Sequence, residues 1–359
     1  MKKVVCGMLM LISFAFICVE VFAGPRRRWV GEGWKRRMEK EQNKRDAEQY
    51  YAEGVALMQQ KRYEEAAEKF EIATDIKKDY YDAYYMFGKV LFILEYYEDA
   101  IERFTKASNL NKKVPEPHIG LGDCYIQLKK WNDAVGAYRK ALAMNENLYE
   151  ARTGLGIALH NKKDFAQAVE ELKKAVKLSP KPISAYYWLG LSYAETKCWK
   201  DAVDALRKVL SLDSKFEEVR LIIARIYEKS AQYKDAIEEY KRFESRNSLY
   251  TPFALKRIAE VYESFLVDIP NAIIYYEKYL KKTSDLKVSE RVKRLKAGEP
   301  VEPIKDEEEP TIAPNPELFP GGKAPESSED ENKKEEKKEG EGGVKPPELP
   351  GSPSGGAEK

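Results

Sequence analysis

Apolar residues between positions 47 and about 250 recur at the spacing of amphipathic helices. One stripe stands at i, i+3, i+4 and i+7 and consists of Tyr84, Phe87, Gly88 and Leu91. A second stripe follows after a short polar or mixed break, in Tyr97, Ala100, Ile101, Phe104 and Ala107. Residues at this spacing lie on one side of a helix, so the pattern predicts a helix, a turn and a second helix packed antiparallel on the first.

The pattern repeats every 34 residues without an insertion across six units. Three positions show it best, and their members are Gly54, Gly88, Gly122, Gly156, Gly190 and Ala224; Ala66, Ala100, Ala134, Ala168, Ala202 and Ala236; and the aromatics Tyr63, Tyr97, Trp131, Phe165, Trp199 and Tyr233. The glycine is expected where the first helix approaches the second closely, and the alanine is small for the same reason. These are packing positions.

We place the units at 47–80, 81–114, 115–148, 149–182, 183–216 and 217–250. A seventh unit, 251–283, aligns if one extra residue enters before Arg257 and another near Pro270, so that Ala272 matches Ala236. Residues 284–296 then carry Val288, Val292 and Leu295 at helical spacing in a basic, polar setting. This predicts a closing helix, because a terminal repeat needs a polar outer face.

The unit resembles the tetratricopeptide repeat. The resemblance is carried by AYYWLGLSY at 185–193, DAIERFTKA at 99–107 and Pro180, and it covers residues 47 to about 250. It implies an all-α, right-handed solenoid whose concave groove holds peptides or folded partners. The family's exported members include helper proteins for pilus assembly and outer-membrane assembly.

No side chains in the sequence group into a catalytic, cofactor-binding or metal-binding constellation. Cys124 falls at a small buried repeat position, and Cys198 at a surface position two repeats away, so no disulfide joins them. His118 occupies a packing position, whereas His160 points into the groove without a neighbouring metal ligand. We therefore expect a protein that is not an enzyme and binds no cofactor.

One face of the first helices is expected to be solvent-facing, apolar and aromatic. Its candidate partner-binding residues are Tyr51, Val55, Met58, Tyr85, Met86, Phe92, Ile119, Ile126, Ile157, Tyr187, Trp188 and Leu191. Exposed apolar patches mark binding sites, and aromatics anchor interfaces. The expected partner is an apolar protein segment, extended or helical. The alternative is that some of these side chains pack against neighbouring first helices.

The two ends of the chain differ from the repeats. Residues 1–23 resemble a signal peptide, with Lys2 and Lys3, an apolar run and a small residue at Ala23. Cleavage there predicts an exported, periplasmic or secreted chain. Positive charge directly after an apolar run favours retention, so an uncleaved anchor with a cytoplasmic solenoid is the alternative.

Residues 24–46 form a basic arm whose candidate contacts with an anionic membrane surface are Arg26, Arg27, Arg28, Trp29 and Trp34. The alternative is an arm that only extends the first helix. No nucleic-acid partner is expected. Residues 297–359 contain 17 acidic and 8 basic residues and 11 of the 18 prolines, which predicts a disordered tail. Leu318 and Phe319 interrupt its polar run.

Together these features predict an interaction scaffold or adaptor of the cell envelope that buries a partner segment in its groove. A substrate-delivery or regulatory subunit of an envelope enzyme or assembly complex is one alternative. A membrane-peripheral structural protein held by the basic arm is the other.

Overall fold

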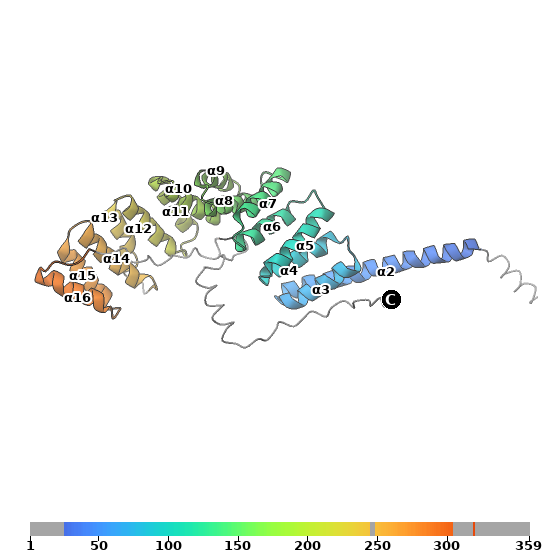
Figure 1. Ribbon diagram of the computed structural model, residues 1–359, viewed down its shortest axis with the longest axis horizontal. Helices are drawn as coiled ribbons and strands as arrows, with labels where there is room; N and C mark the ends of the chain where they lie inside the picture. The colour runs from blue at the N-terminus through green and yellow to red at the C-terminus, as the bar shows by residue number, and fades with distance from the viewer. Residues whose placement is uncertain (1–24, 245–247, 304–318, 320–359) are drawn as a thin grey trace, which may run out of the picture. The chain divides into compact units, whose positions relative to one another are not determined.

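The computed structural model describes residues 25–244, 248–303 and 319, with side chains described from residue 32 onward. Every element in this part of the chain is an α-helix, as the repeat predicts (Figure 1). The predicted signal peptide and the predicted tail from residue 304 onward, Phe319 excepted, lie outside the described residues. No described helix has the length and apolar character needed to span a membrane.

The described helices fall into two compact units that divide within α6, between Cys124 and Tyr125. The first unit contains α2 (Pro25–Gln59), α3 (Tyr63–Ile76), α4 (Tyr81–Ile93), α5 (Tyr97–Leu110), the beginning of α6 (Glu116–Gln127) and the end of α7 (Trp131–Met144). In it α2 packs on α3, α3 on α4 and α4 on α5, and α2 also touches α4.

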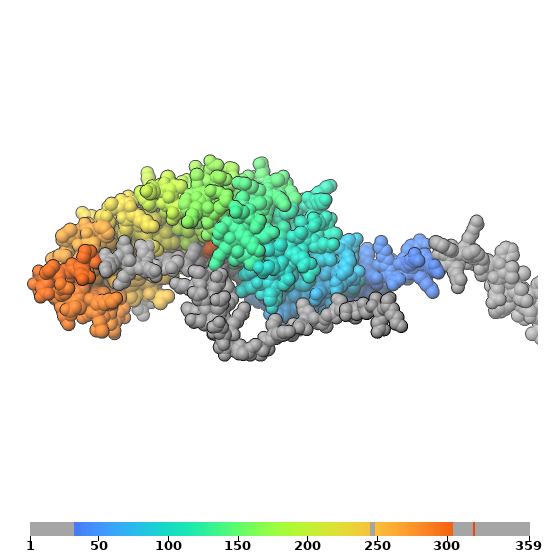
Figure 2. Space-filling model, in the orientation of Figure 1, coloured from blue at the N-terminus to red at the C-terminus, as the bar shows by residue number. Residues whose placement is uncertain are grey.

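The second unit holds the remainder of α6 and α7 and all later helices. These are α8 (Tyr149–Asn161), α9 (Phe165–Ala175), α10 (Ile183–Glu195), α11 (Trp199–Leu212), α12 (Glu218–Lys229), α13 (Tyr233–Lys241), α14 (Thr251–Ser264), α15 (Ile269–Leu280) and α16 (Leu286–Ala297). From α8 onward each helix contacts its successor. Figure 2 shows their side chains closely packed on the face in view.

The helices of one repeat approach closely at the repeated glycine. A Cβ atom on Gly88 would lie 2.8 Å from the Phe104 ring, and one on Gly156 would lie 2.4 Å from Leu172. Phe104 and Leu172 are almost fully buried, so neither can move away without disturbing its neighbours. The predicted packing role of the glycines is therefore confirmed at these two positions.

Each turn between the two helices of a repeat contains one residue with a left-handed backbone. These residues are Lys61, Glu95, Lys129, Lys163, Lys197, Ala231 and Val267, and none is a glycine. The following N–H group donates back across the turn, for example from Asp164 to the Leu159 carbonyl at 2.9 Å. This bond satisfies a carbonyl at the end of the first helix.

Of the two extra residues predicted in the seventh repeat, the one near Pro270 lies in the turn between α14 and α15. Asp268 donates to the carbonyl of Tyr262, six positions back, whereas the equivalent bond in the fourth repeat spans five positions. Val267 has the left-handed backbone here, with φ at 54°. The Asp268 side chain then caps α15 by accepting from the Asn271 N–H group at 3.1 Å.

Buried ion pairs join the last repeats to the closing helix. The Tyr276 hydroxyl donates to Glu263 at 2.8 Å, and Arg291 of α16 donates to the same carboxylate at 2.9 Å. Burial and the Glu263 charge raise the pKa of Tyr276. Tyr240 and Arg257 meet Glu228 in the same way, one repeat earlier. Each carboxylate is thus shared by a tyrosine and an arginine from different helices.

The structure shows how the repeats begin and end. Helix α2 is continuous from Pro25 to Gln59, so the basic arm extends the first repeat helix, which is the alternative that the sequence left open. At the other end, the residues just after α16 were predicted to begin the disordered tail. Gly298 instead ends the helix with φ at 67°, and Arg291 donates to the Glu302 carbonyl at 2.9 Å. Val301 packs on the core beside them.

Replacing Val267 by glycine is expected to stabilise the chain. A β-branched residue is strained at positive φ, and glycine relieves about 1–2 kcal/mol of that strain. The Val267 side chain is 75% exposed, so little packing is lost. Urea unfolding followed by circular dichroism should show a higher midpoint for Val267→Gly. Val267→Ala is the control, because it keeps most of the strain and should gain much less. A midpoint for the glycine variant at or below that of the alanine variant would contradict this assignment.

Candidate functional site

The predicted partner-binding face lies on the first helices of the repeats, but only part of it is accessible. Seven of its residues are half-buried, namely Tyr51, Val55, Met58, Tyr85, Met86, Ile119 and Leu191. Five are buried, namely Phe92, Ile126, Ile157, Tyr187 and Trp188. The expectation of a wholly solvent-facing row is therefore wrong for these five. Within the second unit one cause is that α8 contacts α10, so side chains fill the space between them.

In the first unit, this face is a set of touching aromatic rings. The centroids of Tyr51 and Tyr80 lie 5.2 Å apart, and Tyr81 stacks on Tyr85 at 6.2 Å with nearly parallel planes. Burial is the main reason why the pKa values of Tyr80 and Tyr81 rise to about 12. All four hydroxyls are therefore uncharged at neutral pH, and the surface presents neutral rings.

In the second unit, a cavity opens between α10 and α12. Its volume is about 420 Å³, and its apolar lining includes Tyr187, Leu191 and Ala194 from α10 with Ile222 and Ile226 from α12. Tyr187 and Leu191 belong to the predicted row, and Ala194 occupies a position on the same face. The two isoleucines were not predicted. The cavity is large enough to bury a substantial apolar group.

Charged side chains also line this cavity. Lys197, Arg225 and Lys229 contribute positive charge, and Glu195 is the acidic residue among the lining residues. Burial lowers the pKa of Arg225, although an arginine remains charged at neutral pH. The lining therefore carries net positive charge, which favours a partner with acidic groups beside its apolar side chain.

His160 and Trp188 fill the space between α8 and α10. Their ring centroids lie 5.2 Å apart in an edge-to-face arrangement, and His160 also meets Phe165 at 5.3 Å. Burial lowers the pKa of His160 to about 4, so the imidazole is neutral at pH 7. The predicted orientation of His160 into an open groove is therefore only partly correct, because neighbouring rings cover it.

Ser192 links His160 to the backbone of α10. Its hydroxyl lies 2.8 Å from the Trp188 carbonyl, to which it donates. The same Ser192 Oγ lies 3.0 Å from His160 Nδ1, within hydrogen-bond distance. The imidazole is thus held in place by a hydrogen bond as well as by the neighbouring rings.

Phe319 lies against the Trp188 ring of this group. Its centroid is 5.0 Å from that of Trp188, with the planes at 73°. The Phe319 side chain is 8% exposed and that of Trp188 is 2% exposed. A residue far along the predicted tail is thus in contact with α10.

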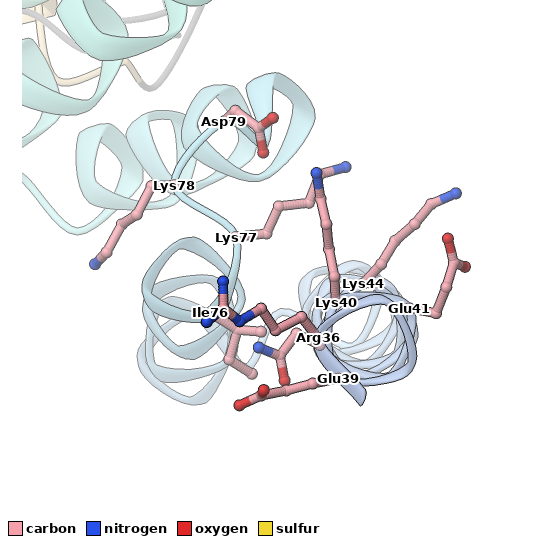
Figure 3. A pocket seen from close by; sticks show the side chains of 10 residues that line it. Arg36, Glu39, Lys40, Glu41, Lys44, Ile76, Lys77, Lys78 and Asp79 are labelled. Atoms are coloured by element: carbon pink, nitrogen blue, oxygen red, sulfur yellow. The ribbon is translucent and has the colours of Figure 1, made fainter. Parts of the chain in front are cut away.

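A second cavity, of about 400 Å³, lies between α2 and the turn that follows α3 (Figure 3). Its basic lining comes from Arg36, Lys40, Lys44, Lys77 and Lys78, and its acidic lining from Glu39, Glu41 and Asp79. Trp34, one of the predicted membrane contacts, is 59% exposed. The other four predicted contacts, Arg26, Arg27, Arg28 and Trp29, lie in α2, and their side chains are outside the described residues.

The cysteines lie where the repeat predicts. Cys124 is buried, Cys198 is exposed, and both are free thiols. Burial raises the pKa of Cys124, which makes it a packing residue rather than a nucleophile. In the described part of the chain, no three His, Cys, Asp or Glu side chains come together as metal ligands.

Three family models match the repeats. Residues 59–141 match the model described as anaphase-promoting complex, cyclosome, subunit 3, residues 158–197 match a TPR repeat, and residues 184–215 match a tetratricopeptide repeat. No curated protein sequence matches the chain significantly.

Solved structures of repeat proteins are also similar to this chain. YrrB, described as a TPR protein with an unusual peptide-binding site, is 26% identical, with 49% of this chain and 91% of YrrB covered and a TM-score of 0.43. PilF of Pseudomonas aeruginosa is 21% identical, with 59% and 96% covered and a TM-score of 0.46. The Cut9-Hcn1 structure of the anaphase-promoting complex is 20% identical, with 70% and 43% covered and a TM-score of 0.45.

The half-buried His160 is expected to make stability fall in mild acid. Its pKa is lower in the folded chain, at about 4, than the ordinary value of 6.5, so the unfolded chain binds the proton more tightly below pH 6.5. The free energy of unfolding should fall by about 2 kcal/mol between pH 7 and pH 5 on this account.

The matched comparison is His160→Asn, which keeps an N–H donor for Ser192 and does not titrate. Denaturant titration gives the unfolding free energy of the wild type and of this variant at each pH. The stability of the wild type relative to the variant should fall by about 2 kcal/mol when the pH is lowered from 7 to 5. A difference that stays constant with pH, or a His160 titration midpoint near 6.5 by NMR, would refute the buried neutral imidazole.

Proposed function

We propose that this chain, a member of the tetratricopeptide-repeat family, is a non-enzymatic scaffold that binds a partner segment in the cavity between α10 and α12. The family and its fold are interaction modules in general. The observation that carries the proposal is the cavity itself, because apolar side chains of two successive first helices line it and Leu191, Ala194 and Ile222 among them are half-exposed.

The chemistry of the cavity defines the class of partner. Leu191, Ile222 and Ile226 offer apolar surface that an aliphatic or aromatic side chain can cover. Lys197, Arg225 and Lys229 would attract acidic groups that flank that side chain. We infer that the partner is a protein segment with one or two large apolar residues next to aspartate or glutamate.

The partner's main-chain conformation follows from the lining. The cavity lies between two helices and offers side chains rather than an exposed strand edge, so strand addition is not available as a binding mode. A short extended or helical segment that inserts one side chain suits a space of about 420 Å³ better than a large flat interface.

We place this activity in the cell envelope. The support is the N-terminal pattern of two lysines, an apolar run and Ala23, which is typical of an export signal. Expression in the native host followed by N-terminal sequencing should give a mature chain that begins at Gly24. A chain that retains Met1 and fractionates with the cytoplasmic side of the membrane would support the uncleaved anchor instead.

Partner binding should be lost when a charge enters the cavity. Leu191→Glu places a carboxylate on the apolar lining, and the half-buried position lets the helix tolerate it. Leu286→Glu is the matched control, because it is the same substitution at a leucine that is 83% exposed in α16. Both variants should keep the helical circular dichroism of the wild type.

The measurement is crosslinked capture from the host's envelope fraction, analysed by mass spectrometry. The wild type and Leu286→Glu should capture the same partner, and Leu191→Glu should capture at least tenfold less. Identical capture by all three chains would show that the cavity is not the binding site, and it would direct attention to the basic surface of α2.

A further inference from the structure

Phe319 stands out in the sequence that surrounds it. It is the first aromatic residue after Tyr279 and the last of the chain, in a segment rich in proline, glycine and charge. Its neighbours read Glu317, Leu318, Phe319, Pro320 and Gly321. A segment of this composition has no apolar core of its own, so a phenylalanine within it gains by covering an apolar surface elsewhere.

The structure shows which surface Phe319 covers. Its ring meets Trp188 edge to face at 5.0 Å, a preferred geometry for aromatic pairs, and only 8% of the Phe319 side chain stays exposed. Loss of more than nine-tenths of its accessible surface is typical of a core residue rather than of a side chain resting on the outside.

The receiving rings are held rigidly by their own partners. Trp188 packs edge to face on Tyr187 at 5.7 Å and on His160 at 5.2 Å. His160 is fixed in turn by its hydrogen bond to Ser192, whose hydroxyl bonds the Trp188 carbonyl. A surface that is already ordered costs little entropy when it binds, which favours a small ligand such as one aromatic side chain.

We propose that Trp188, backed by His160 and Tyr187, forms a binding site for a phenylalanine side chain, and that its occupant is Phe319 of the same chain. The site is separate from the cavity between α10 and α12, although Tyr187 belongs to both. The proposal does not rest on the proposed function, because its ligand is part of this chain. It assigns Phe319 as an internal ligand.

Tethering makes such a weak contact effective. Fifteen residues, 304–318, separate Phe319 from Pro303, the last described residue before it. A tether of that length gives an effective concentration on the order of millimolar. A free peptide of the same sequence must therefore compete with Phe319 unless Phe319 is removed.

The first test uses the full chain labelled with 5-fluorotryptophan, which has five tryptophans, with the Trp188 signal assigned by Trp188→Phe. Phe319→Ala should shift the ¹⁹F signal of Trp188 and leave the other four in place. Leu349→Ala, a truncation at another apolar residue of the same segment, should shift none. An unchanged Trp188 signal in Phe319→Ala would overturn the proposal. So would a wild-type signal that changes on dilution, because the occupant would then come from a second copy.

The second test adds the synthetic peptide PNPELFPGGK, residues 314–323, in trans. It should bind the Phe319→Ala chain, move the Trp188 signal toward its wild-type position, and bind the wild type at least tenfold more weakly. The same peptide with alanine at the phenylalanine position should bind neither chain. Equal binding to wild type and Phe319→Ala would refute occupation of the site by Phe319. Because neither test involves the envelope partner, its outcome is distinguishable from that of the Leu191→Glu experiment.

Discussion

The close approach of the two helices within a repeat is the constraint on which the architecture depends. At Gly88 and Gly156 there is no room for even one added carbon, because Phe104 and Leu172 occupy the space. A large apolar side chain seated on a glycine fixes the rotation of both helices about their axes. Because the same rotation recurs every 34 residues, it also fixes which face of each first helix points toward the first helix of the next repeat.

The second unit has a filled space and an open one at positions one repeat apart. Between α8 and α10 the positions are taken by His160 and Trp188, whose rings touch. One repeat later the same positions carry Ala194 and Ile222, and a cavity of about 420 Å³ remains. The backbones of α8 and α10 also lie closer together than those of α10 and α12, so helix spacing and side-chain size both contribute to the difference.

The sequence was sufficient to predict the helices, because the glycine, alanine and aromatic positions all report the same 34-residue period. The period carries no information about backbone angles in the turns. The left-handed position is held by residues such as Lys163 and Glu95 rather than by glycine, so no residue type identifies it. The continuity of α2 was left as one of two alternatives for a related reason: the composition changes from basic to apolar near Ala47, but a change of composition does not by itself stop a helix.

The candidate site was predictable in position but not in exposure. The spacing placed Tyr187 and Leu191 on the face that lines the cavity, and yet one is buried and the other half-exposed. The exposure of each side chain depends on the side chains of the next first helix, which lies 34 residues further along the sequence. Comparing residues one period apart would have given the missing signal, since the step from Trp188 to Ile222 removes a ring from the interface. In a repeat protein, binding sites can therefore arise where one unit places a smaller side chain at a position that its neighbours fill.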